Sequence, residues 1–306
     1  MARRWLTGDC PDGFALDLTH GAVDAIERLL SAHLVTGDKV AVEDPCFIGS
    51  INTLRLAGLQ AVGVPVDAQG MQADALERAL AEGARAVIIT PRAHNPTGFS
   101  LSRARASKLQ RVLARHTGCL LIVDDHFGLL ATSAYQNVIP PRASRWALVR
   151  SVSKMFGPDL RLAFVASDTD TSDRLRLRLA PGANWVSHLL QQAVLACMSS
   201  DEVAERVAKG RKAYAERRSM LAQSLAARGI EVATPADGLN LWLPLHGASQ
   251  PLVKRLAELG WGARSGEPFG VDVPAHGLRI TVSDIDMGIS EAFAESLHKI
   301  LVESAI

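Results

Sequence analysis

Hydrophobic and polar residues alternate between two periods along the first two-thirds of the chain. Short apolar runs bounded by polar residues predict buried strands at residues 39–43, 86–90, 119–124 and 146–149. Apolar residues recur at helical spacing over 71–81 and 101–116, which predicts two amphipathic helices between strands. This strand–helix–strand alternation predicts an α/β fold with a mostly parallel sheet covered by helices on both faces.

The pattern changes near residue 201. A long helix is predicted over 201–228, followed by a short apolar segment, a helix over 250–259, a strand over 278–282 and a helix over 289–302. These elements are typical of a smaller C-terminal α+β domain. We therefore expect a large domain over residues 1–205 and a small domain over residues 206–306.

Composition and charge restrict the function classes. The chain has 306 residues, of which 48% are hydrophobic and 21% charged, and this balance is typical of a soluble globular protein. Its formal net charge of +1 gives no overall attraction to DNA or to an anionic membrane. No apolar stretch is long enough to span a bilayer. Four widely spaced cysteines disfavour structural zinc and a disulfide framework, so we expect a cytoplasmic protein without a metal.

A lysine lies between two serines and an arginine directly after the strand predicted at 146–149. We expect Lys154 to be partly desolvated at the strand end, which favours the neutral amine that attacks carbonyl groups. Ser151, Ser153 and Arg161 carry the hydroxyl and guanidinium groups that hold a phosphate. An imine-forming amine beside a phosphate site indicates pyridoxal 5'-phosphate (PLP). The alternative is a strand end followed by a solvated loop, because short Ser/Lys strings are common.

Two further polar residues follow predicted strands. Asp124 closes an apolar strand, where a carboxylate is costly unless it has a cationic partner such as a protonated pyridine nitrogen. The alternative is an aspartate that caps a helix. Asn95 lies in a His-Asn-Pro-Thr-Gly segment that predicts a tight turn, and its carboxamide is able to donate to the phenolic oxygen of PLP. The alternative is a turn with no further role.

Three other segments carry candidate binding groups. Gly21 and Ala22 open the helix predicted over 23–35, where free backbone N–H groups bind phosphate, although simple helix capping explains the same residues. Phe47 is able to stack on a flat heteroaromatic ring or to be an ordinary core aromatic. Arg279 projects from a late strand and is suited either to a bidentate contact with a substrate carboxylate or to a surface ion pair.

With these segments in this order along the sequence, the chain resembles the class I and II aminotransferases of PLP-dependent transferase fold type I. Within them it is most similar to the aminotransferase-like domain of MocR/GntR-type transcriptional regulators. The resemblance spans nearly the whole chain and rests on residues 16–22, 42–47, 89–98, 122–126, 151–161 and 277–280. It implies PLP as cofactor and a homodimer in which a partner subunit completes each site.

The resemblance also implies a role for each candidate residue. Lys154 would form the internal aldimine, and Asp124 would pair with the pyridine nitrogen. Asn95 would bond the phenolic oxygen, Phe47 would stack on the ring, and Arg279 would bind a substrate α-carboxylate. The phosphate would be held by Ser151, Ser153, Arg161 and the amides of Gly21 and Ala22.

The chain departs from the family pattern at two places. The family usually has a tyrosine two or three residues after the aspartate, and this chain has His126 and Phe127 there. We expect His126 to contact the cofactor, with an acidity unlike that of tyrosine. The region before residue 19 is short, whereas MocR regulators carry a winged helix-turn-helix there. We therefore expect a shortened chain or an isolated domain that does not bind DNA by itself.

These features favour one function over two others. The leading hypothesis is a PLP-binding effector or sensor domain of a MocR/GntR-type regulator, which responds to an amino acid or a PLP-related small ligand. The alternative is an active PLP-dependent aminotransferase that exchanges an amino group between an amino acid and a 2-oxo acid. A degenerate scaffold without cofactor is disfavoured because Lys154, Asp124 and Arg279 are all present.

Overall fold

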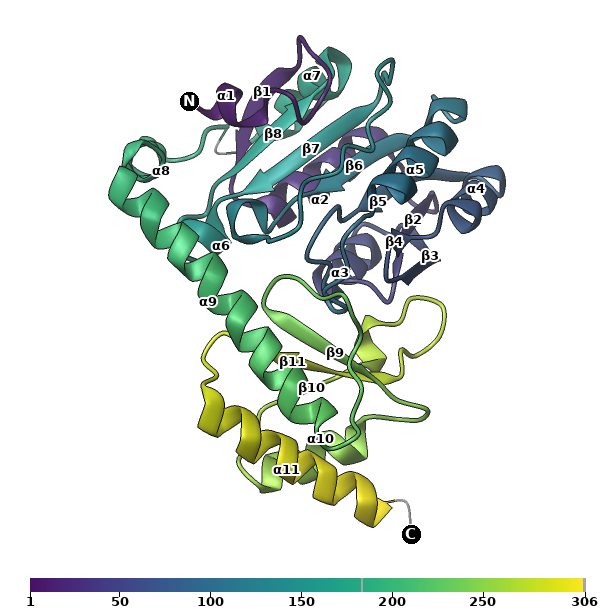
Figure 1. Cartoon of the computed structure of the whole chain (residues 1–306). Coiled ribbons are helices and arrows are strands. Elements are labelled where there is room, and N and C mark those ends of the chain that lie inside the picture. The colour runs from purple at the N-terminus through teal and green to yellow at the C-terminus, as the bar shows by residue number, and fades with distance from the viewer. Residues whose placement is uncertain (183, 305–306) are drawn as a thin grey trace.

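The computed structural model describes residues 1–182 and 184–304. These residues form two β-sheets connected through a long helix (Figure 1). The predicted α/β fold is confirmed. Among the described residues, no helix is both long enough and apolar enough to cross a bilayer.

The larger sheet has eight strands in the order β1-β8-β7-β6-β5-β2-β3-β4. Their bounds are β1 Ala15–Thr19, β2 Lys39–Asp44, β3 Gln60–Asp67, β4 Gly70–Met71, β5 Ala84–Ile89, β6 Leu120–Asp124, β7 Trp146–Ser151 and β8 Ala163–Ser167. The pairs from β3 through β2, β5 and β6 to β7 are parallel, whereas β8 is antiparallel to both β7 and β1. The carboxyl ends of β2, β5, β6 and β7 therefore meet at one edge of the sheet.

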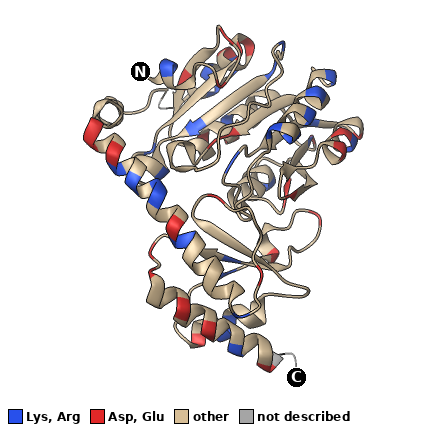
Figure 2. Cartoon of the chain, viewed as in Figure 1, with Lys and Arg blue, Asp and Glu red and all other residues tan. Residues whose placement is uncertain are grey.

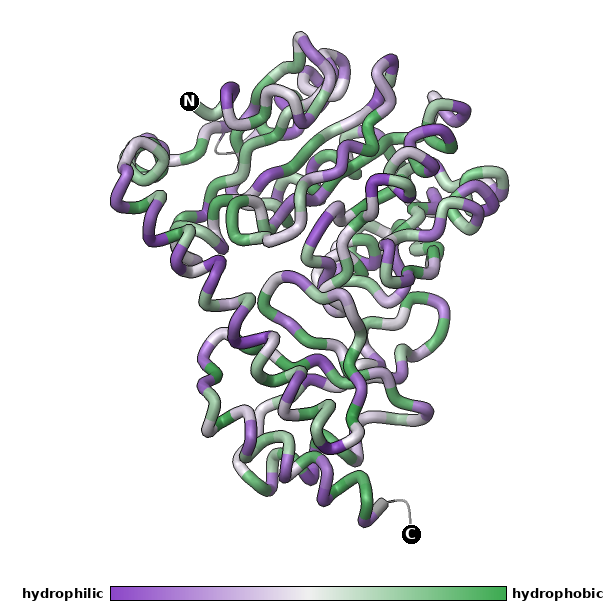
Figure 3. Tube along the Cα trace, viewed as in Figure 1, coloured by the Kyte–Doolittle hydropathy of each residue, from purple (hydrophilic) through white to green (hydrophobic). Residues whose placement is uncertain are grey.

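Helices cover both faces of this sheet. They are α1 (Ala2–Leu6), α2 (Ala22–His33), α3 (Ile48–Leu56), α4 (Ala73–Ala81), α5 (Arg103–Arg115), α6 (Ser153–Phe156), α7 (Thr169–Leu179) and α8 (His188–Ser199). In β2, Val40 and Val42 belong to the core with α2, α3 and α7, while Ala41 belongs to the core with α4 and α5. Strands buried on both faces need continuous apolar runs, which the central strands show in Figure 3.

The C-terminal part contains a small antiparallel sheet in the order β10-β11-β9. Its elements are α9 (Asp201–Ala226), β9 (Asn240–Pro244), α10 (Gln250–Glu258), β10 (Arg264–Ser265), β11 (Gly277–Thr281) and α11 (Met287–Ser304). Two short 3₁₀-helices complete the description, η1 (Gly128–Leu130) and η2 (Glu267–Phe269). Apolar residues of α9, α10 and α11 pack on this sheet as a separate core. The domain division at residues 205/206 stays a prediction.

The predicted helices are found with boundaries shifted by one or a few residues, and two of these shifts have a clear local cause. The helix predicted at 71–81 begins only at Ala73, because Gly70 and Met71 form the hairpin strand β4 with β3. The helix predicted to end at 228 ends at Ala226, followed by a cap in which Ile230 N donates to Leu225 O (3.0 Å). Gly229 has φ +72° in this cap, a conformation that glycine adopts without strain.

Candidate functional site

A cavity of about 380 Å³ lies where the carboxyl ends of β2, β5, β6 and β7 face β9 and β11. Ligands of open parallel sheets bind beyond this edge. The predicted residues that line the cavity are Ala22, Phe47, Asn95, Asp124, His126, Ser151, Ser153, Lys154, Arg161 and Arg279. Gly21 is next to this wall and contacts Arg161. The structure thus brings the predicted residues together, and their roles stay predictions.

Asp124 ends β6 on the floor of the cavity. Burial raises the pKa of its carboxyl group, His126 opposes the shift and the neighbouring Asp125 adds to it. Its Oδ1 atom has no hydrogen-bond partner among the described residues. Its Oδ2 atom is 3.7 Å from Nδ1 of His126, which also lacks a hydrogen bond in that part of the chain. Asp124 is therefore a buried acid whose Oδ1 atom lacks the partner that a buried carboxylate needs.

Lys154 lies on α6, the short helix that directly follows β7. The expected desolvation of this lysine is wrong for the single chain, because its side chain is exposed on the cavity wall. The strand end itself is buried at Ser151, but α6 carries the chain from there to the rim of the cavity. Among the described residues, Lys154 has no ion pair or hydrogen bond that would hold its amine elsewhere.

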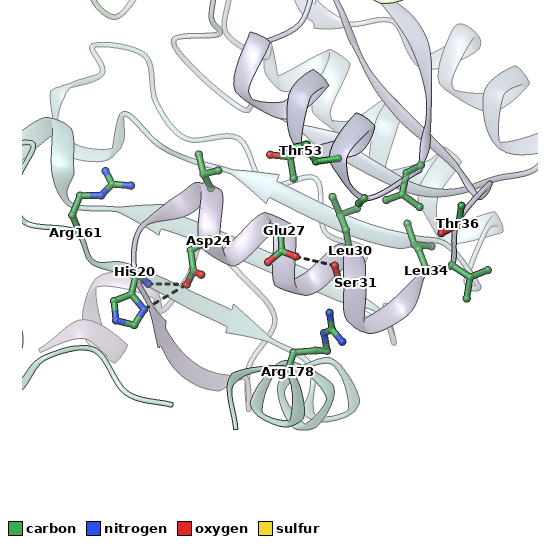
Figure 4. Close-up of a pocket in the computed structure, with 15 residues that line it drawn as sticks. His20, Asp24, Glu27, Leu30, Ser31, Leu34, Thr36, Thr53, Arg161 and Arg178 are labelled. Atoms are coloured by element: carbon green, nitrogen blue, oxygen red, sulfur yellow. Dashed lines mark hydrogen bonds and ion pairs between the residues drawn. The ribbon is translucent and has the colours of Figure 1, made fainter. Parts of the chain in front are cut away.

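A group of polar atoms gathers at one end of the cavity. Ser151 Oγ accepts a hydrogen bond from Ser153 N (3.2 Å), and Arg161 Nη1 donates to Ser153 Oγ (3.3 Å). Figure 4 shows Arg161 near the start of α2, where His20 and Asp24 lie. Gly21 is the N-terminal flanking residue of this helix, and its φ is +97°. These groups are suited to an anion, because an arginine and a helix N-terminus both favour negative charge.

Gly21 lets the arginine approach the helix. A Cβ atom at this position would lie 2.6 Å from Arg161 Nη2, which is far closer than real Cβ contacts. The backbone conformation therefore favours glycine here, and any larger residue would displace the guanidinium group of Arg161.

Arg279 connects the small sheet to the turn that follows β5. Its Nη1 atom donates to Oδ1 of Asn95 (3.1 Å), and its guanidinium carbon lies 5.4 Å from the centre of the Phe269 ring. Burial lowers the pKa of Arg279, and the charge of Arg264 on the paired strand lowers it further. Its Nε atom has no partner, and no acid pairs with it in the described residues. The alternative of a surface ion pair is therefore not observed for the described chain.

Sequence reasoning missed a buried charge network behind Asp124. Asp125 is fully buried and accepts two hydrogen bonds from Arg92, at 2.8 and 2.9 Å, and one from Arg150 at 2.7 Å. Burial would raise the pKa of Asp125, but the hydrogen bonds and charges of the two arginines hold it below its usual value. Arg150 also donates to Asp9 Oδ2 (2.8 Å). The network fixes the end of β6, and its signal in the sequence was a charged residue, Arg150, directly after the apolar run of β7.

Comparison with known proteins agrees with this geometry. The profile of the family described as "Aminotransferase class I and II" matches residues 15–297. The "Vitamin B6 salvage pathway transcriptional repressor PtsJ" of Salmonella typhimurium is 54% identical over 98% of this chain and 70% of its own length. The "2-aminoadipate transaminase" of Thermus thermophilus is 26% identical over 92% of this chain and 73% of its own length.

A solved structure, kynurenine aminotransferase of Pyrococcus horikoshii, superimposes with a TM-score of 0.89 at 20% identity, over 99% of this chain and 79% of that one. At this identity the likeness establishes the fold. The fold is that of PLP-dependent transferases of fold type I, and the chain belongs to the class I and II aminotransferase family.

Proposed function

We propose that this chain is the PLP-binding effector domain of a MocR/GntR-type transcriptional regulator. The observation that carries the proposal is the unpartnered carboxylate oxygen of Asp124, which lies in one cavity with the free amine of Lys154. The identity of 54% with a repressor of vitamin B6 salvage supports a regulatory role.

PLP is the cofactor of this family, and the cavity fits it. The Oδ1 atom of Asp124 lacks a partner, and a protonated ring nitrogen would supply a cation there. The arginine and serines beside Gly21 form an anion site for the phosphate. The cofactor supplies an aldehyde that amines attack and a ring that accepts electrons.

Each candidate residue of the cavity then has a defined role. Lys154 presents its amine from the cavity rim, and Asp124 holds a proton at the ring nitrogen. Phe47, which is 38% exposed and lines the cavity, would pack against the ring. Asn95 and His126 would donate hydrogen bonds to the cofactor from the cavity wall. Arg279 already donates to the side-chain oxygen of Asn95, Oδ1.

The effector would be an amino acid or a PLP-related ligand. Arg279 is a half-buried cation without an acidic partner in the described chain, so it is suited to a carboxylate. Arg279 belongs to the small sheet, whereas Lys154 follows a strand of the large sheet. A ligand that contacts both side chains therefore ties the two sheets together, and this change is what a regulator would detect.

We further propose a homodimer through the face formed by α2 and α3. Val23, Val35 and Leu56 on this face are 44%, 68% and 89% exposed. They surround an open groove that shares Arg161 with the cavity (Figure 4). A second copy of this chain on the face would cover the apolar side chains and bring its residues next to the phosphate site.

The effector role places the protein in the cytoplasm, where the DNA is. Acidic and basic residues are interspersed along α9 and α11 (Figure 2), and the net charge is only +1. Both observations support the expectation that this chain does not bind DNA by itself.

The second candidate is an active aminotransferase, which the 26% identity with 2-aminoadipate transaminase favours. The two functions differ in turnover. We expect the PLP-loaded protein to bind the cofactor but to convert amino acids with 2-oxo acids at well below about 1 per second, an ordinary rate for an enzyme. Steady-state assays over a panel of amino acids measure this rate, and turnover at or above it would support the enzyme instead.

A further inference from the structure

A second buried acid lies on the floor of the cavity, at the end of β2. Glu43 is 4% exposed and lines the cavity together with Asp124. Its two carboxyl oxygens accept hydrogen bonds from Thr90 N at 3.1 and 3.2 Å. No lysine or arginine pairs with Glu43 in the described residues. An ionised Glu43 would therefore be a second uncompensated charge in one small space.

The neighbour of Glu43 is a histidine that is equally buried. Nε2 of His94 is 3.4 Å from Glu43 Oε2, which is its nearest acid, and it has no hydrogen-bond partner in the described chain. Nδ1 of His94 is 2.8 Å from Thr97 Oγ1, which also accepts a hydrogen bond from Phe99 N. If Nδ1 carries the imidazole proton and donates it to Thr97, Nε2 is left as an acceptor that faces the carboxyl group.

We propose that Glu43 is protonated and donates a hydrogen bond to His94 Nε2, so that Glu43 adds no second negative charge beside Asp124. The chain from Glu43 through His94 to Thr97 then positions the turn that carries Asn95. The proposal rests on the proposed function only in treating this cavity as the cofactor site.

The charges around the pair favour this arrangement. The pKa of Glu43 is raised to about 8, because burial and the charge of Asp124 outweigh the opposing hydrogen bonds from Thr90. Burial and, to a smaller extent, the charge of His126 together lower the pKa of His94 to about 3, so His94 does not become a compensating cation. Cys46, also buried here, has a thiol pKa raised well above its usual value by burial and the nearby acids, and it stays neutral.

Infrared spectroscopy of the cofactor-free protein tests where the proton resides. One sample carries ¹³C in the side-chain carboxyl groups of glutamate, and another carries it in those of aspartate. At about pH 6.5, below the pKa of Glu43 (about 8), we expect a protonated carboxyl band that shifts with the glutamate label. The band should disappear as the pH passes above about 8. The absence of a protonated carboxyl band that shifts with the glutamate label would overturn the proposal.

Two variants and ¹⁵N spectroscopy test whether the band belongs to Glu43. Glu43→Gln should remove the band, whereas Glu202→Gln, at a side chain that is 71% exposed, should keep it. If Glu43→Gln does not fold, ¹⁵N spectra of histidine in the natural sequence decide: neutral His94 with its proton on Nδ1 supports the proposal, and a charged His94 contradicts it. All measurements use protein without PLP, so their failure is distinct from a failure to bind PLP.

Discussion

Two adjacent aspartates at the end of β6 have opposite surroundings. Asp125 is held by Arg92 and Arg150, whereas Oδ1 of Asp124 has no hydrogen-bond partner in the described chain. An unpaired buried carboxylate destabilises a protein, and one that faces a cavity is a mark of ligand binding rather than of folding. The charge network behind it anchors the strand end that presents it.

Asp124→Asn should stabilise the cofactor-free protein near neutral pH. Because the pKa of Asp124 is raised by burial, the folded state binds more protons than the unfolded state, and stability falls as pH rises above the ordinary aspartate value. The amide removes this loss but no longer pairs with a protonated ring. Thermal unfolding with and without PLP measures both effects. A variant that is less stable without PLP, or equally stabilised by PLP, contradicts this role.

Asp125→Asn is the contrasting change. It leaves two arginines without their shared carboxylate, and breaking such a buried pair costs about 3–5 kcal/mol. Urea unfolding of the cofactor-free variant should show this loss. An unchanged midpoint would mean that the network does not hold the end of β6.

Arg161→Ala should weaken the binding of PLP but not of pyridoxal, which lacks the phosphate. One lost charge-assisted contact corresponds to about 2 kcal/mol, or roughly 30-fold in Kd. Arg178→Ala is the matched control, because Arg178 lines the neighbouring groove and not the cavity. Fluorescence titration of each variant with PLP and with pyridoxal measures the four dissociation constants. Equal losses for PLP and pyridoxal would remove Arg161 from the phosphate site.

At the scale of elements, the start of α2 joins backbone conformation to binding. Gly21→Ala should destabilise the protein by about 1–2 kcal/mol, because the residue has a positive φ, and should also displace Arg161. Gly37→Ala is the matched control, since Gly37 has φ +91° and open space around it. Both variants should lose stability in urea, and only Gly21→Ala should lose PLP affinity. Equal PLP affinity in the two variants would contradict the contact with Arg161.

The sequence indicated which elements carry the site but not how they pair across the sheet. Asp124 and Asn95 could be placed because polar residues after apolar strands gather at one edge. The ion pairs of Arg150 with Asp9 and Asp125 could not, because they join residues that are 141 and 25 positions apart. The exposure of Lys154 was missed for a similar reason, since the geometry of α6 and not the strand end determines it.

At the scale of the whole molecule, the face of α2 and α3 should determine assembly. Leu56→Glu should shift the protein from dimer to monomer, because it places a charge on the apolar face. Leu259→Glu changes a leucine that is 56% exposed at the end of α10, in the small domain, and should leave the dimer intact. Sedimentation velocity distinguishes these outcomes. A Leu56→Glu dimer of natural stability would exclude this face as the interface.

The central claim is that PLP binds in this cavity on the amine of Lys154. Borohydride reduction of the PLP-loaded protein, followed by peptide mass mapping, tests it most directly. We predict a single pyridoxyl-modified peptide that contains Lys154, and no modified peptide from a folded Lys154→Ala variant treated in the same way. Modification at another lysine, or an equal yield of modified peptide from Lys154→Ala, would contradict the account.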